Sequence, residues 1–317
     1  GHTVYATKEE AEAEKEQVIS IYKEICEKFM ALPSLIGRKS EKEKFAGAEY
    51  TVSMEFLMPN GKAIQGPDFH YDGQNFSKAY SIKFLDKGGK EQYAYQNTFA
   101  ITTRMIGVMF AIHSDSKGLI LPPKIAQNAV VIVPILFDDS KSKVLKKAEE
   151  IRKKLENFNP ILDAREEHTP GFKFNEWEMK GIPLRIEIGP KDMEKDSAVL
   201  VRRDTNKKEI VKISDIAKKS EEILEDIQDS LLRNAEKKLK DGISKDSTLQ
   251  GTIKAIKGKK IAFAPLCKAK YCEDILKSKT DGAKVLNIPE KQMFAKEEKC
   301  IICGKQADYI AYVGKSY

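Results

Sequence analysis

The sequence QNTFAITTRMIG, at residues 96–107, says more about the fold of this chain than any other segment. Its first half has the composition of a strand, and the apolar residues Met105 to Ile112 predict a helix. Because that helix is apolar on nearly every side, we expect it to lie inside a large domain. Arg104 stands at the junction, where a buried guanidinium is costly unless an anionic group meets it. Alternatively, its side chain extends to the surface at an element boundary.

Upstream of this junction the pattern predicts an antiparallel sheet. Residues 50–58 alternate apolar and polar side chains, which is typical of a half-buried strand. Asn60-Gly61 is a hairpin signal, and residues 62–65 begin the return strand. Further strands are expected at residues 79–85 and 92–97, with the helix packed on the sheet that they form.

Downstream of Pro123 the order of elements changes. Residues 129–136 form a continuous apolar run, which is expected of a strand covered on both faces. Short strands near Ile161, at 184–188 and at 198–201 alternate with helical segments. This alternation favours a small α/β domain with parallel strand pairing.

Length and charge limit the class of protein. With 317 residues the chain can hold two or three domains. A net charge of +7, with 32% charged residues, suits a soluble protein with a polyanionic partner. The lysines are spread through helical faces, so charge alone supports nucleic-acid binding only weakly. No apolar run is long enough to cross a bilayer and no signal peptide is visible, so we expect a cytoplasmic protein without a membrane partner.

Four of the five cysteines follow a helix expected at residues 214–240 and form two close pairs: Cys267 with Cys272, and Cys300 with Cys303. Two pairs separated by a long excursion have the spacing of a tetrahedral zinc site. Four thiolates fill the coordination sphere, so we predict a structural zinc without an open catalytic position. The alternative is two disulfides or unreacted thiols. Cys26, on the apolar side of a helix, is expected in the core.

Three parts of the sequence carry a resemblance to a known family. The first joins TTRMIG at 102–107 to GLILPP at 118–123, the second is HTPGFKFNEWE at 168–178, and the third is GIPLR at 181–185. Together they resemble prolyl-tRNA synthetase of the archaeal and eukaryotic type, a class II enzyme, and the first is similar to its motif 3. The resemblance covers essentially the whole chain, and three separated segments are far more specific than one motif.

The resemblance implies a multidomain fold of α+β and α/β parts. Residues 1–126 would form the remainder of the class II antiparallel-sheet catalytic domain. Residues 127–213 would form an α/β anticodon-binding domain, and residues 214–317 a helical linker and a small zinc-binding α+β domain. There is no room before Arg104 for the large editing domain of bacterial relatives, and the cysteines also indicate the archaeal and eukaryotic type.

The resemblance also implies an ATP site. In that family the motif 3 arginine lies against the ATP triphosphate, where a bidentate fork suits phosphate oxygens. This makes Arg104 the catalytic residue, on the side of the leaving pyrophosphate. Gln65 matches a glutamine that helps to hold magnesium-bound ATP, and we assign Asp68 to the same ATP and magnesium site.

The proline pocket is implied by three further residues. His2 matches a histidine that borders the pocket, although Gly1-His2 could instead be a remnant of protease cleavage. His70 matches a histidine that contacts the amino acid, although a histidine in a loop is more often structural. Phe99 stands where relatives carry tryptophan.

Several positions in this pocket depart from the family pattern. Pro67, Asp68 and Phe69 replace glycine, threonine and serine, and Ala100 replaces glycine. The family's His-Gly-Asp-Asp is here His-Ser-Asp-Ser from His113 onward. A carboxylate such as Asp68 repels phosphates unless magnesium or a lysine intervenes. Clustered changes of this kind indicate a remodelled or decaying pocket.

In the α/β domain the resemblance implies that Lys173, Glu176 and Arg185 contact the anticodon of proline tRNA. His168 and Trp177 are interpreted as packing residues. Motif 1, which builds the dimer interface, and the motif 2 arginine would lie upstream of Gly1. The chain begins without methionine, so we expect a fragment, a processed chain or a trimmed form, inactive until an N-terminal portion joins it and forms the homodimer.

Two functions remain open. The first is the C-terminal portion of a proline–tRNA ligase, which activates proline with ATP and transfers it to proline tRNA. The second is a non-catalytic tRNA-binding paralogue whose adenylation site has degenerated. The missing motifs do not separate them, the pocket substitutions favour the second, and the strength of the family match favours the first.

Overall fold

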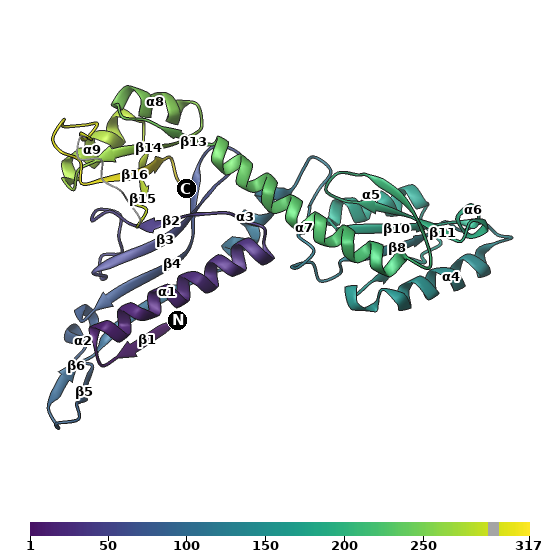
Figure 1. Ribbon diagram of the computed structural model, residues 1–317, viewed down its shortest axis with the longest axis horizontal. Coiled ribbons are helices and arrows are strands. Elements are labelled where there is room, and N and C mark those ends of the chain that lie inside the picture. Colours follow the sequence, from purple (N-terminus) through teal and green to yellow (C-terminus); the bar gives the residue numbers. More distant parts are fainter. Residues whose placement is uncertain (291–297) are drawn as a thin grey trace. The chain divides into compact units, whose positions relative to one another are not determined.

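The computed structural model describes residues 1–290 and 298–317 (Figure 1). Contacts between Cα atoms divide the chain into two compact units. Unit 1 comprises residues 1–26, 32–108 and 236–317, and unit 2 comprises residues 27–31 and 109–235. Both are mixed α/β structures, and none of their described helices is both long and apolar enough to span a membrane.

Unit 1 contains a five-stranded antiparallel sheet, here called sheet A, with the strand order β1-β7-β4-β3-β2. Its strands are β1 His2–Tyr5, β2 Leu35–Arg38, β3 Tyr50–Leu57, β4 Ala63–Gly73 and β7 Tyr95–Ala100. Its other elements are α1 Lys8–Glu24, α2 Asn75–Ala79 and the hairpin of β5 Lys83–Leu85 and β6 Glu91–Tyr93. The π-helix Ile25–Phe29 and α3 Arg104–His113 begin in unit 1 and end in unit 2.

Helix α1 covers one face of sheet A. It begins at the N-cap Thr7, whose side chain accepts a hydrogen bond from the Glu10 backbone N–H in a capping box. The amide Nδ2 of Asn97 donates to the Ala11 carbonyl over 2.8 Å. Asn97 therefore marks the face of β7 that points toward α1.

Strand β3 differs from the half-buried strand predicted at residues 50–58. Its polar residues Thr51, Ser53 and Glu55 are as buried as its apolar ones. The C-terminal part of unit 1 packs against β3, since the amide of Asn287 donates to the Ser53 carbonyl over 3.2 Å. Alternation in the sequence could not reveal a cover contributed by residues more than 200 positions away.

Strand β4 begins within residues 62–65, where the start of the return strand was predicted, and it includes His70, which was expected in a loop. A proline normally interrupts a strand that has neighbours on both sides. Pro67 falls where the register with β3 shifts, between the pairs Glu55–Gln65 and Ser53–Asp68. The irregular pairing accommodates the proline, so β4 continues to Gly73.

Helix α3 follows β7 as predicted, but it is not enclosed by the described residues. Met105, Val108 and Met109 are buried, whereas Ile106 is 43% exposed. Arg104 is also exposed, so the expected cost of burying its guanidinium does not arise. Apolar composition predicted the helix correctly but not the extent of its cover.

The C-terminal part of unit 1 is a four-stranded sheet with the order β13-β14-β16-β15. Its elements are β13 Ile243–Lys245, α8 Leu249–Lys257, β14 Ile261–Leu266, α9 Lys270–Lys279, β15 Lys284–Asn287 and β16 Tyr309–Gly314. It joins sheet A through backbone hydrogen bonds between Arg38 and Ile288 of 2.7 and 2.8 Å. A Cβ on Gly37 would lie 2.4 Å from the Ile288 carbonyl oxygen, so this approach requires glycine.

Unit 2 is built on a mixed sheet with the order β12-β11-β10-β8-β9, in which β8 is parallel to β9 and β10. Its strands are β8 Val130–Pro134, β9 Ile161–Leu162, β10 Leu184–Ile188, β11 Ser197–Arg202 and β12 Lys208–Lys212. Its helices are α4 Lys141–Lys154, the 3₁₀ turn Glu156–Phe158, α5 Pro170–Lys180, α6 Pro190–Glu194 and most of α7 Ile216–Asp241.

Both faces of β8 are covered, as its apolar run predicts. Val130 and Ile132 pack in the large core that includes α4 and α7. Val131 and Val133 pack on the other face with Trp177 of α5. The parallel strands β8 and β9 therefore end at one edge of a sheet that has helices on both sides (Figure 1).

Candidate functional site

The side chains predicted to hold ATP and the amino acid form a connected row along β4. Gln65 Nε2 donates to Asp68 Oδ2 over 2.8 Å, and His70 Nε2 lies 3.4 Å from the same oxygen. The other ring nitrogen of His70 is 2.8 Å from the hydroxyl of Thr51. Gln65, Asp68 and His70 thus form one row of polar contacts along the strand, here called the β4 row.

Arg104 lies beside this row at the first residue of α3. Its NH1 group donates to the Gln65 carbonyl over 2.9 Å. No carboxylate among the described residues forms an ion pair with Arg104. The exposed guanidinium therefore retains donors for an anion, and a planar fork is well suited to phosphate oxygens.

His2 also reaches this region, whereas Phe99 does not. His2 Nδ1 lies 3.3 Å from the Thr98 hydroxyl. Thr98 is paired directly with His70, and Phe99 is paired with Phe69, so the two pairs lie on opposite faces of sheet A. The ring of Phe99 stacks on Phe69 at 6.0 Å between centroids. The structure thus brings His2 and His70 toward one face and leaves Phe99 on the other.

Asp72 is a residue of this region that the sequence did not identify. Its Oδ2 accepts a hydrogen bond from the Thr98 hydroxyl over 2.7 Å, and its buried Oδ1 has no partner within the described residues. The side chain is only 1% exposed, and this burial raises the pKa of its carboxyl group. Asp72 lies two residues after His70, so the two side chains share a face of β4. The sequence could indicate this only if β4 were known to continue to Asp72.

Glu55 is a buried carboxylate of β3 that lies outside the β4 row. It is 1% exposed and forms a 2.5 Å ion pair with Lys39, which also donates to the Leu286 carbonyl over 2.8 Å. A buried pair that has further hydrogen bonds is strongly destabilised when one partner is lost. These contacts join sheet A to the C-terminal sheet of unit 1.

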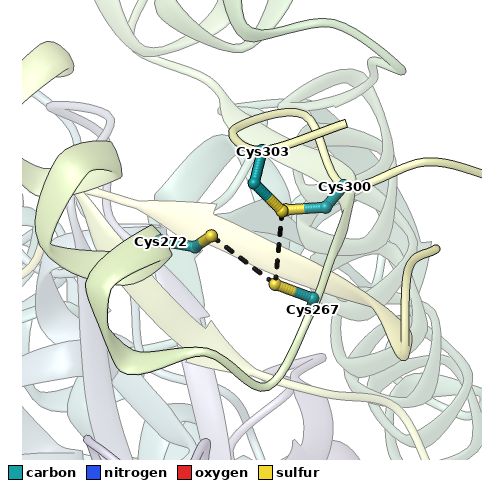
Figure 2. A group of neighbouring side chains, drawn as sticks. All are labelled: Cys267, Cys272, Cys300 and Cys303. Atoms are coloured by element: carbon teal, nitrogen blue, oxygen red, sulfur yellow. Dashed lines mark hydrogen bonds between the residues drawn. The ribbon is translucent and has the colours of Figure 1, made fainter. Parts of the chain in front are cut away.

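The four C-terminal cysteines converge as their spacing predicts (Figure 2). Cys267 directly follows β14, Cys272 lies on α9, and the other two lie at a turn before β16. All four sulfur atoms lie within 4.8 Å of one another, and Cys267 Sγ is 3.5 Å from Cys272 Sγ and 3.8 Å from Cys303 Sγ. Both distances are too long for an S–S bond, and all four cysteines are free, so the predicted alternative of two disulfides is not what the structure has.

The cluster fits a tetrahedral metal ion. Four sulfurs at about 2.3 Å from zinc would be about 3.8 Å apart, close to the observed separations. A hydrogen bond from the Lys305 backbone N–H lowers the pKa of Cys303 to about 6. Burial raises the pKa of Cys267 and Cys272. Only a cation would stabilise all four sulfurs as thiolates, which is the form that binds metal.

In unit 2 a buried carboxylate, Asp163, is held by Arg165, Trp177 and Lys173, and only Lys173 among these was predicted to contact the anticodon. Arg165 donates to both of its oxygens, over 2.8 and 2.7 Å, and Trp177 Nε1 donates to Oδ2 over 2.8 Å. Lys173 donates to the Asp163 carbonyl over 3.1 Å. Burial opposes ionisation of Asp163, but the hydrogen bonds from Arg165 and Trp177 and the charge of Lys173 lower its pKa to about 2.

The three predicted anticodon residues differ in their access to solvent. Lys173 is 2% exposed, so its ammonium points to Asp163 and away from solvent. Arg185 is also buried, paired with Glu187 over 3.0 Å and with Glu178 over 3.2 Å. Glu176 retains partial exposure on α5, where Lys180 and Arg165 donate to it.

A cavity of about 290 Å³ lies near this network, at the carboxyl end of β8. Lys141, Arg165 and Lys173 line it together with His168. Next to it, the rings of His168 and Phe172 stack at 4.2 Å, and Phe172 is 50% exposed. Ligands of α/β sheets commonly bind at the carboxyl ends of parallel strands.

Comparison with known proteins decides the family. The family described as "Anticodon binding domain" matches residues 129–223, and that described as "Prolyl-tRNA synthetase, C-terminal" matches residues 250–317. The Proline--tRNA ligase of Clostridium botulinum (strain Loch Maree / Type A3) is 43% identical over 319 residues, covering 100% of this chain and 66% of the relative. This chain belongs to the prolyl-tRNA synthetase family.

Other members of the prolyl-tRNA synthetase family are equally similar. Proline--tRNA ligase 2 of Bacillus thuringiensis (strain Al Hakam) is 42% identical, and Proline--tRNA ligase of Lachnoclostridium phytofermentans is 44% identical. Each match covers 100% of this chain and 66% of the relative. All three relatives are bacterial.

The two family matches correspond to different sheets of this prolyl-tRNA synthetase family member. The anticodon-binding match spans the sheet of unit 2 and the first part of α7. The C-terminal match begins within α8 and contains all four clustered cysteines. The predicted resemblance to prolyl-tRNA synthetase is confirmed.

Proposed function

We propose that this chain is part of a proline–tRNA ligase, in which unit 1 contributes to activation of proline by ATP and unit 2 contributes to tRNA binding. The main support is the meeting of Arg104 with the β4 row, because roles inferred separately from sequence converge in one place. Similarity to proline–tRNA ligases along the whole chain adds to it.

Activation requires the proline carboxylate to attack the α-phosphate while pyrophosphate leaves. Arg104 would offset the charge that develops on the leaving pyrophosphate, since preorganised positive groups stabilise such transition states. Gln65 and Asp68 offer oxygen ligands of the kind that magnesium prefers, and magnesium would relieve repulsion between Asp68 and ATP.

For proline we propose contacts with His2 and His70. Phe99 is proposed to support this pocket from the other face of sheet A, because its ring packs on Phe69, the neighbour of His70. Motifs 1 and 2, together with the homodimer that motif 1 builds, are proposed to come from an N-terminal portion.

For the four cysteines we propose a structural zinc ion. Four sulfur ligands leave no coordination position for substrate, so the ion would stabilise the C-terminal sheet of unit 1. The cysteines lie directly after β14, on α9 and in the segment before β16, so a shared ion would connect three parts of this C-terminal region.

For proline tRNA we propose recognition of the anticodon near the start of α5. Unpaired bases are commonly recognised by stacking on aromatic rings and by hydrogen bonds to their edges. Phe172 offers an exposed ring, and Glu176 offers a partly exposed acceptor. Lys173 and Arg185 are buried and would contribute indirectly, because their hydrogen bonds hold α5 in position.

A non-catalytic tRNA-binding paralogue is the second proposal, and one observation favours it. Gln65 and Asp68 are hydrogen-bonded to each other, and Asp68 places a carboxylate where the family carries a threonine. If no magnesium enters, this pair opposes ATP binding while unit 2 remains complete.

Proline-dependent exchange of pyrophosphate into ATP separates the two proposals. The chain alone should show no exchange, because loss of one preorganised charged group commonly costs about a hundredfold or more in rate. Joined to the remaining third of the Clostridium botulinum relative, it should show exchange if it is a ligase portion. The matched control is the same fusion with Asp68→Thr. Exchange only in that control would identify the paralogue.

A further inference from the structure

The positive charge of this chain is concentrated at its C-terminal end. Residues 243–317 contain 15 lysines and eight acidic residues, while the net charge of all 317 residues is +7. The rest of the chain is therefore balanced overall. Lysines do occur along the whole chain, as the sequence indicated, but the net positive charge of the whole chain equals that of this segment.

Part of this excess surrounds one pocket in unit 1. The pocket has a volume of about 330 Å³ and lies between the β3–β4 turn, the loop after α8, the end of α9 and the segment after β16. Ile253 and Ile256 contribute apolar lining, and among the described residues that line it Asp281 is the one acidic residue. The lysines that line it are Lys62, Lys257, Lys259, Lys260, Lys279 and Lys315.

Most of these lysines have no anionic partner within the described part of the chain. Lys315 pairs with Asp281 over 2.8 Å, and Lys62 lies over the ring of Tyr317 at 5.0 Å. The other four form no ion pair with a described carboxylate. Elsewhere in unit 1, by contrast, Lys39 is paired with Glu55. Like charges gathered without partners repel one another until an anion binds between them.

The backbone around the pocket indicates which kind of anion fits. Compact polyphosphates are usually held by backbone N–H groups at helix N-termini. Here α8 and α9 contribute their C-terminal ends, at Lys257 and Lys279, where the helix dipole carries partial negative charge. Attraction must therefore come from long lysine side chains around a wide rim. Such point charges suit the spaced phosphates of a nucleic-acid backbone better than one compact anion.

We propose that this lysine pocket is a second RNA-binding surface, which holds the phosphodiester backbone of RNA without reading its bases. It is built from unit 1 residues and contains none of the residues proposed to read the anticodon. Only the identity of the RNA as tRNA rests on the proposed function. The binding of an RNA backbone does not.

The test is a fluorescence anisotropy titration of the full chain with labelled proline tRNA across a range of salt concentrations. The pocket variant is Lys257→Gln/Lys259→Gln/Lys260→Gln. The matched control is Lys268→Gln/Lys270→Gln/Lys305→Gln, which removes three exposed lysines of the C-terminal part of unit 1 that do not line the pocket. We expect the pocket variant to bind at least about tenfold more weakly, with a salt slope smaller by about 2, and the control to bind within about twofold of the parent.

Two further arms separate this proposal from others. An anticodon-swapped tRNA should lose the same factor of affinity in parent and pocket variant, so failure of anticodon reading would leave the pocket result intact. Inorganic tripolyphosphate should compete only weakly. Strong competition by tripolyphosphate, lost in the pocket variant, would assign the pocket to a free polyphosphate and overturn RNA as its occupant. Equal RNA binding by the pocket variant and the control would overturn the pocket altogether.

Discussion

Asp72 of unit 1 and Asp163 of unit 2 are both buried aspartates, 1% and 3% exposed, yet their surroundings shift their pKa values in opposite directions. Asp163 receives hydrogen bonds from Arg165 and Trp177, and its pKa falls to about 2. Asp72 receives one from Thr98, one of its oxygens has no partner among the described residues, and burial raises its pKa. The surroundings thus stabilise the ionised form of aspartate in unit 2 and destabilise it in unit 1.

This contrast extends to other polar groups in the two units. In unit 2 the guanidinium groups of Arg185 and Arg203 form ion pairs with carboxylates of the same unit. In unit 1 Arg104, the four clustered cysteines and most of the lysine pocket lack such partners within the described residues. Unit 1 does contain paired groups, such as Lys39 and Glu55. We infer that unpartnered groups mark the places in unit 1 where ions and ligands bind.

The largest effect should come from the metal. Purified protein should contain about one zinc per chain, and Cys300→Ser should lose it and unfold the C-terminal sheet of unit 1, because binding energy at such sites is folding energy. Hydrogen exchange in β14 and β16 measures this. Trp177, the only tryptophan, reports on unit 2 and should be unaffected.

Cys26→Ser is the matched control, since Cys26 is buried but lies outside the cluster. It should retain zinc. Protein without zinc, in which all four thiols of the cluster react freely, would show that these cysteines need no cation.

The next effect concerns Asp163. Asp163→Asn leaves the shape of the side chain but removes the charge that faces the buried Lys173, and breaking a buried pair typically costs about 3–5 kcal/mol. Urea unfolding followed by Trp177 fluorescence should show that the free energy of unfolding of unit 2 falls by this amount. The destabilisation should be full above about pH 4 and should vanish near pH 2, where the native carboxyl group also becomes protonated. No change at pH 7 would mean that this pairing does not stabilise unit 2.

Arg104 should show the opposite behaviour, with a large effect on activity and little on stability. In the fusion that supports pyrophosphate exchange, Arg104→Lys should reduce the rate about a hundredfold, because a point charge does not reproduce the bidentate fork. Unfolding should hardly change, since the described contact of Arg104 is one hydrogen bond to Gln65. Arg165→Lys is the control from unit 2, and it should lower stability while exchange continues. Normal exchange in Arg104→Lys would make Arg104 a structural residue.

Local patterns in the sequence predicted a considerable part of this structure. The apolar run 129–136 predicted β8 with two covered faces, and the spacing of the cysteines predicted their convergence. Both succeed because the relevant signal lies within a few residues or in a recognised ligand spacing. The resemblance to prolyl-tRNA synthetase was likewise carried by short segments.

Features that depend on distant partners could not be predicted. The end of β4 was missed because Pro67 interrupts the strand pattern, and Asp72 was missed with it. The exposure of α3 depends on which other segments pack against the helix, and the composition of the helix does not contain that information. Lys173 was expected at a surface, but its burial follows from Asp163, which lies on another segment. In each case the deciding contact comes from an element elsewhere in the chain.

The smallest effect, and the sharpest test of the contrast between the two aspartates, is expected from Asp72→Asn. A group whose pKa is raised by folding destabilises the folded state at pH values above its folded pKa, and this penalty disappears as the pH falls below the unfolded value. For Asp72 the substitution should therefore stabilise sheet A at pH 7, by about 1 kcal/mol, since a neutral amide is less costly to bury than a carboxylate. The gain should shrink toward zero below about pH 4, whereas the loss in Asp163→Asn persists to lower pH. Hydrogen exchange in β4 and β7, measured at several pH values, follows sheet A separately from the Trp177 signal of unit 2. Destabilisation by Asp72→Asn at neutral pH would mean that the carboxylate is needed in the folded chain, and the contrast between the two units would then fail where it is most specific.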